Sequence, residues 1–318
     1  MLINGGMHMS AYIDKQKVKN TSLIKSGFFE DDPGNGTYRN GKSYPFMLRD
    51  CRKNLHHSIR SDAIEYFDRY KIKWHSMEHT VNSQVACVNH LFPIRRNKEA
   101  VLNILKTISP DFNDVLSVED TEDYIQFEAV GGNVNLLNEG CNLRGKYNTA
   151  VDALIFAVDK NNKRVLIPFE WKYAESYGKK ECFTDAKKSG NSGKTSGEVR
   201  QDRYYDLIEK CTRLKTDESK KYGNYEPFYQ LLRQTLWADQ VRQKASDFIA
   251  DDFIHVHVIP DGNTTLLNKG LSGMNMTDTW KSCLTEPDKY IVISPKELWR
   301  EQSNDTELFN YLEKRYWT

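Results

Sequence analysis

The sequence lacks long apolar runs, paired cysteines and glycine-rich phosphate-binding motifs. No stretch approaches 18 consecutive apolar residues, so no membrane span is expected. The N-terminus has no apolar signal core, and the six cysteines include no CxxC or CxxxC pair, which favours a cytoplasmic chain with reduced thiols. Neither GxxxxGK[ST] nor GxGxxG occurs, so nothing indicates nucleotide-driven chemistry.

An excess of charge of one sign is also lacking. Lys and Arg number 45 against 44 Asp and Glu, which excludes a strongly cationic coat for nucleic acid. Cations nevertheless gather in residues 12–60 and 176–200, whereas residues 101–140 are acidic. The two basic stretches could bind a phosphate backbone, or they could be ordinary solvated loops.

The order of apolar patterns predicts an α/β fold. We expect residues 1–45 to form an extended N-terminal arm with turns at Pro33-Gly34 and Asn40-Gly41, and residues 46–318 to form one domain. Helices are predicted over 58–70, 75–92, 97–108, 198–214 and 227–250 and after Pro295, and strands over 124–130, 149–158, 164–173, 253–260 and 290–294. This order favours a central mixed β-sheet with helices on both faces.

The most informative segment is a predicted hairpin, TAVDALIFAV (149–158) and RVLIPFEWKY (164–173). Folding it about Asn161 places Asp152 opposite Glu170, with Cβ atoms about 4.5–5.5 Å apart. Glu170 and Lys172 then share one face, and Trp171 points into the core. Pro168 removes one donor from the ladder, and a bulge there would shift this register by one residue.

Two acids in an apolar sheet require compensating positive charge. Lys172 supplies one charge, so a divalent cation would complete the balance, and Mg²⁺, with Mn²⁺ as a substitute, suits a site built from carboxylates and substrate phosphate. The set would then serve phosphodiester hydrolysis. The alternative is a solvated hairpin end with an ordinary ion pair.

His255 and His257 alternate on one predicted strand, and we expect a structural role rather than a metal pair.

The segments NTAVD (148–152) and PFEWKY (168–173) resemble the motif of the PD-(D/E)XK nuclease superfamily, the restriction-endonuclease-like fold. The segments EHTVNSQ (78–84) and YQLLR (229–233) are similar to a bacterial branch of restriction-endonuclease-like proteins. The resemblance implies metal ligation by Asp152, Glu170 and the main-chain carbonyl of Trp171, and a water-activating or charge-stabilising Lys172. It also implies a further acid from the first core helix, for which Glu78 is the candidate, and Gln84 is a weaker candidate nearby.

The resulting prediction is a Mg²⁺-dependent endonuclease of restriction or repair type that acts on DNA, most plausibly double-stranded. The predicted DNA contacts come from the basic loop and one helix face: Lys187, Lys188, Lys194, Arg200, Gln230 and Arg233. Cleavage of both strands would favour a homodimer. The competing hypotheses are a catalytically inactive nucleic-acid-binding protein that retains the fold, and an enzyme that acts on RNA.

Overall fold

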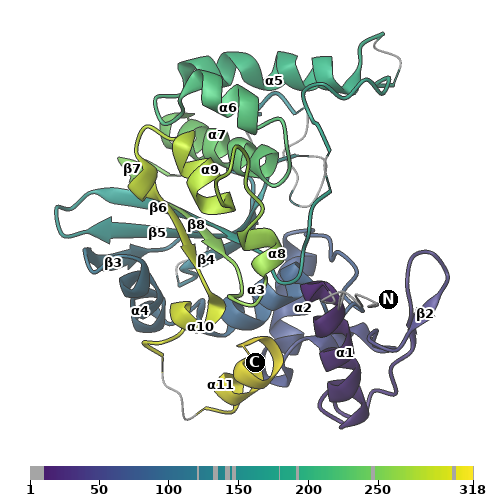
Figure 1. Cartoon of the computed structure of the whole chain (residues 1–318). Coiled ribbons are helices and arrows are strands. Elements are labelled where there is room, and N and C mark those ends of the chain that lie inside the picture. Colours follow the sequence, from purple (N-terminus) through teal and green to yellow (C-terminus); the bar gives the residue numbers. More distant parts are fainter. Residues whose placement is uncertain are drawn as a thin grey trace, which may run out of the picture.

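The structure is a computed structural model that describes residues 11–119, 122–131, 135–139, 144, 148–178, 180–190, 193–244, 248–302 and 306–317 (Figure 1). Its centre is a seven-stranded mixed sheet in the order β3-β5-β6-β8-β9, in which β4 also pairs with β5 and β7 with β6. The strands are β3 (Phe112–Leu116), β4 (Ile125–Ala129), β5 (Val151–Asp159), β6 (Arg164–Trp171), β7 (Asp252–Phe253), β8 (His255–Val258) and β9 (Tyr290–Ile293). None of the helices within these ranges has the length and apolar character needed to cross a bilayer.

The hairpin β5–β6 has the register that the sequence predicts. Val158 pairs with Arg164 and Ala153 with Phe169, so the next position along brings Asp152 opposite Glu170. Pro168 pairs in step with this register, and no bulge interrupts this described ladder. On its other edge β6 pairs first with β7 and then with β8, and the break between them lies beside Pro168, where β6 has no N–H to donate.

Helices cover both faces of the sheet, as predicted (Figure 1). One apolar cluster packs α2, α3, α4, α10 and α11 against one face, and a second packs α5, α6, α7, α8 and α9 against the other. The bounds are α2 (Arg60–Arg69), α3 (Ser83–Leu91), α4 (Lys98–Ile108), α5 (Ser196–Lys210), α6 (Thr216–Tyr222), α7 (Phe228–Lys244), α8 (Thr264–Leu267), α9 (Met276–Ser282), α10 (Pro295–Leu298) and α11 (Glu307–Leu312).

The N-terminal residues correct the expectation of an extended arm. Residues Tyr12–Lys25 form helix α1, which lies against the body because the Tyr173 hydroxyl donates to Gln16 at 2.8 Å and accepts from Asn20 at 3.3 Å. The predicted turn at Asn40-Gly41 does form, between the short strands β1 (Gly36–Thr37) and β2 (Ser43–Tyr44). Gly41 has a φ of +76°, a backbone conformation that glycine adopts without strain.

Three helix predictions were too long, and one of them is the helix expected over 227–250, which ends at Lys244 as α7. The helix expected over 75–92 begins only at Ser83, because the Asn82 side chain caps it by accepting from the Val85 amide at 3.0 Å. Residues 75–82 therefore form a loop, and this loop carries Glu78. The region predicted as one helix over 198–214 contains α5, which ends at Lys210, and α6 begins separately at Thr216.

Candidate active site

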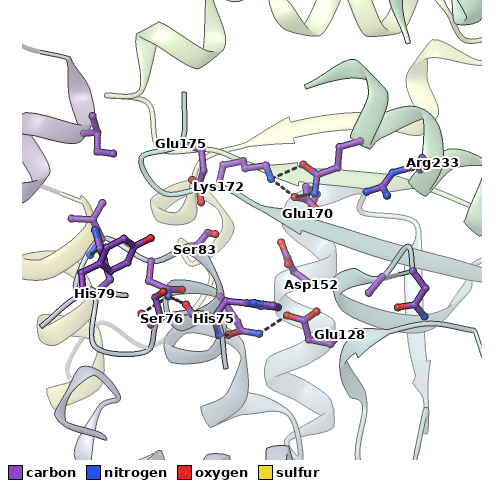
Figure 2. A pocket seen from close by; sticks show the side chains of 18 residues that line it. His75, Ser76, His79, Ser83, Glu128, Asp152, Glu170, Lys172, Glu175 and Arg233 are labelled. Carbon is purple, nitrogen blue, oxygen red and sulfur yellow. Dashed lines mark hydrogen bonds and ion pairs between the residues drawn. The ribbon is translucent and has the colours of Figure 1, made fainter. Parts of the chain in front are cut away.

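Three carboxylates stand next to one another across three neighbouring strands. The β4–β5 register places Glu128 opposite Asp152, and the β5–β6 register places Glu170 on the other side of Asp152. Figure 2 shows Asp152 between the other two side chains. Side chains that are directly opposite on adjacent strands are close enough to interact, so the sheet itself brings the three acids together.

Lys172 and two glutamines of α7 surround Glu170. One oxygen of the Glu170 carboxylate accepts from the Lys172 ammonium and from the Gln230 amide at 2.8 Å, and the other accepts from Gln234. Lys172 also donates to the Gln230 carbonyl at 2.8 Å. Glu170 and Lys172 are 2% and 6% exposed, so their ion pair is formed away from bulk water.

Asp152 accepts a hydrogen bond from the Trp171 amide at 2.6 Å. Trp171 itself points to the opposite side of the sheet, where it is 1% exposed beside His90. Burial raises the pKa of Asp152 well above its ordinary value, and the nearby carboxylates of Glu170 and Glu128 raise it further. Asp152 therefore gains a strong preference for a positive partner as soon as it ionises.

Glu128 is the site residue that the sequence analysis missed. It is 8% exposed, and its carboxylate accepts from the Gln84 amide of α3 at 2.6 Å. Its φ of +50° is uncommon for a side-chain-bearing residue and marks the backbone strain that is typical of functional sites. Burial raises the pKa of Glu128 to about 7, against the opposing effect of the Gln84 hydrogen bond.

The acids open into a cavity of about 560 Å³ (Figure 2). Glu128, Asp152, Glu170 and Lys172 line it on the side of the sheet. Its remaining walls come from distant parts of the chain: Ile13 of α1, Tyr38 of the β1–β2 hairpin, His75, Ser76, His79, Val81, Asn82, Ser83 and Gln84 around the start of α3, and Gln230 and Arg233 of α7. The carboxylates are therefore accessible to a solute, although their side chains are largely buried.

The donor set of this pocket fits a hard divalent cation. When ionised, Glu128, Asp152 and Glu170 carry three negative charges against the single charge of Lys172, and Mg²⁺ prefers such oxygen ligands. The donor atoms of these three acids do not all lie within 4.8 Å of one another. Among the described residues, only His56, His57 and Glu307 form a group that does. A cation bound here would replace some of the hydrogen bonds that now hold Glu170 and Asp152.

A family model described as restriction endonuclease associating with ARP matches residues 26–317. The chain belongs to this family. The resemblance to restriction-endonuclease-like proteins is confirmed by this match, which indicates a nuclease. No curated protein and no solved structure matches the chain.

In this member of the restriction-endonuclease family, the structure brings only some of the predicted site residues together. Asp152, Glu170, Lys172, Gln84, Gln230 and Arg233 line one pocket. Glu78 does not line it, although His75 and His79 of the same loop do, and its charge acts on Cys51. Glu128 occupies the place of a further acid that the sequence analysis assigned to Glu78.

The predicted DNA contacts of the basic loop lie outside the pocket lining. Lys187 and Lys188 are exposed, Lys194 pairs with Asp202 at 2.6 Å, and Arg200 pairs with Asp185 at 3.1 Å. The turn that carries these lysines and the β1–β2 hairpin project toward the same side of the view in Figure 1. Their role in binding stays a prediction.

Four tryptophans are buried in the core rather than exposed for base stacking: Trp171, Trp237, Trp280 and Trp299. His255 and His257 are buried as well, and His257 contacts the Tyr290 hydroxyl at 2.9 Å. Within the described residues these two histidines join no group of three metal-binding side chains.

Proposed function

We propose that the protein is a Mg²⁺-dependent endonuclease that hydrolyses phosphodiester bonds of double-stranded DNA. The observation that carries the proposal is the alignment of Glu128, Asp152 and Glu170 across β4, β5 and β6, with Lys172 beside them in an open pocket. A carboxylate row with one buried ammonium is suited to holding a divalent cation next to a negatively charged substrate. Membership of a restriction-endonuclease family supports a nuclease rather than another phosphodiesterase.

Asp152 and Glu170, together with the Trp171 carbonyl, would hold the cation, and Glu128 would add a third carboxylate. When bound, Mg²⁺ would lower the pKa of a coordinated water and neutralise charge on the scissile phosphate. Burial lowers the pKa of Lys172, but the carboxylate of Glu170 and the other negative groups around it outweigh burial and raise that pKa well above its ordinary value. Lys172 therefore stays an ammonium, which orients the attacking water or stabilises the pentavalent transition state rather than removing a proton.

Cations near the pocket support a nucleic-acid substrate. Burial lowers the pKa of the ring of His75, a pocket residue, and the nearby charges of Arg39 and Lys73 lower it further. Burial, and after it the charge of Lys17, lowers the pKa of His79, which lines the pocket as well. We infer that DNA follows these cations on one side of the pocket and the turn that carries Lys187 and Lys188 on the other.

The test is cleavage of a supercoiled plasmid by the full chain with Mg²⁺, Mn²⁺ or EDTA, beside a matched linear duplex, single strand and RNA. The proposal expects duplex cleavage with Mg²⁺ or Mn²⁺ and none with EDTA. Asp152→Asn should abolish cleavage and leave DNA binding intact, whereas Asp114→Asn, a half-buried strand carboxylate paired with Lys98, should cleave as the wild type does.

Each alternative hypothesis has its own outcome in this experiment. Binding without cleavage in every metal would favour a non-catalytic binder that retains the fold. Cleavage of RNA alone would overturn the assignment of DNA as the substrate.

A further inference from the structure

A second group of metal-binding side chains lies away from the carboxylate pocket. Donor atoms of His56, His57 and Glu307 all lie within 4.8 Å of one another. None of the three lines the carboxylate pocket. They line a separate cavity of about 350 Å³, whose walls include Phe28, Lys53, Tyr311 and Lys314.

The two histidines are held in place by their own contacts. His56 is 4% exposed, its Nδ1 lies 2.8 Å from the Ser58 hydroxyl, and its ring packs edge-on against Tyr311 with centroids 4.8 Å apart. Nδ1 of His56 also accepts from the Ser58 amide at 3.4 Å, so a metal bound at Nε2 would displace the proton of that nitrogen, while the contacts with Ser58 and Tyr311 fix the ring orientation. The His57 ring lies beside it, with centroids 4.4 Å apart.

The third donor already contacts the second. Nε2 of His57 lies 3.0 Å from Oε1 of Glu307. Two ligands of a tetrahedral zinc ion with bonds of about 2.0–2.1 Å are separated by roughly 3.3 Å, so a small outward shift would admit the ion between them.

The donor types separate this site from the carboxylate pocket. Two imidazoles and one carboxylate suit Zn²⁺, whereas carboxylates alone suit Mg²⁺. We propose that His56, His57 and Glu307 form a zinc site whose fourth position, open to the cavity, is taken by water. The proposal does not depend on the nuclease function.

Such an ion would fasten the C-terminal segment to the body of the protein. Glu307 is the first residue of α11, and His57 lies 250 residues earlier in the chain. Just beyond α11, Arg315 donates to the Asn54 carbonyl at 2.7 Å, and Asn54 lies only two residues before His56. The zinc site would thus reinforce a contact between the same two segments and raise the unfolding temperature by binding only the folded chain.

The test uses Co²⁺ and Zn²⁺ on the metal-stripped full chain in an Asp152→Asn background, which weakens binding at the other pocket. The proposal expects one equivalent of Co²⁺ with the intense visible bands of tetrahedral coordination, displaced by one equivalent of Zn²⁺. It also expects Zn²⁺ to raise the unfolding temperature.

His57→Gln and Glu307→Gln should each lose the bands and the thermal shift. Both side chains are more than half exposed, and circular dichroism should confirm that the variants fold. Glu301→Gln, an exposed glutamate shortly before α11 that lines neither cavity, is the matched control and should keep both signals. Absence of tetrahedral Co²⁺ bands in the parent, or equal binding by the His57 and Glu307 variants, would overturn the proposal.

Discussion

Lys172 and Glu170 form an ion pair in which the two side chains are only 7% and 2% exposed. Removal of one partner leaves the other charge buried and uncompensated, so we expect Lys172→Met to destabilise the protein by about 3–5 kcal/mol. Urea unfolding in EDTA at neutral pH measures the loss. Lys98→Met breaks the exposed pair with Asp114 and should cost less than about 1 kcal/mol. Equal losses in the two variants would show that the Lys172 pair is not buried as described.

Glu128 should make the stability of the metal-free protein depend on pH. Its folded pKa of about 7 lies above the ordinary value of 4.5, so between these values the folded state holds more protons than the unfolded state. The free energy of unfolding should therefore fall as the pH rises from about 4.5 to about 7, and level off above. Glu128→Gln should lack this component when urea unfolding is compared across that range. A wild type and variant with parallel pH profiles would contradict the assignment.

The pairing of β5 with β6 could be predicted because the length of the turn between them sets the register. Five polar residues, 159–163, separate the two apolar runs in the sequence. Pairing the runs about Asn161 allows only one register, in which Asp152 lies opposite Glu170. The segment between β4 and β5 is much longer and runs over residues 130–150. The alternating pattern predicted the strand of Glu128 but could not show which residue of β5 it faces.

Helix α1 was missed for a different reason. The residues that anchor it include Gln16 and Asn20, whose buried contacts are hydrogen bonds to Tyr173 rather than apolar packing. Apolar periodicity carries no signal for such a face. Asn82, by contrast, is a residue type that favours the N-cap position, so the start of α3 at Ser83 was within reach of sequence reasoning.

Gln230 should tune the affinity for the cation, because it holds both Glu170 and Lys172. Partners of this kind orient a metal ligand, and their loss typically costs 10–100-fold in affinity. We expect Gln230→Leu to raise the Mg²⁺ concentration needed for half-maximal cleavage by roughly that factor. Gln243→Leu, an exposed glutamine on the same helix, should leave the Mg²⁺ dependence unchanged. A shift of the same size in both variants would argue against a specific role.

Cations on both sides of the pocket should contribute to DNA binding. Each phosphate contact that is lost should lower the slope of log K against log salt by about 0.9. Arg39→Ala and Lys187→Ala should each show this change in fluorescence anisotropy titrations at several salt concentrations. Lys163→Ala removes an exposed cation at the β5–β6 turn, the far end of the hairpin, and should not. Identical slopes for all three variants would remove the proposed DNA path.

The most direct test of the account is the anomalous signal of Mn²⁺ soaked into crystals of the full chain. The account predicts a peak between the carboxylates of Asp152 and Glu170, within coordination distance of both, and its loss in Asp152→Asn crystals. Well-ordered side chains with no peak between them, or a peak that persists in the variant, would contradict the carboxylate row as a metal site.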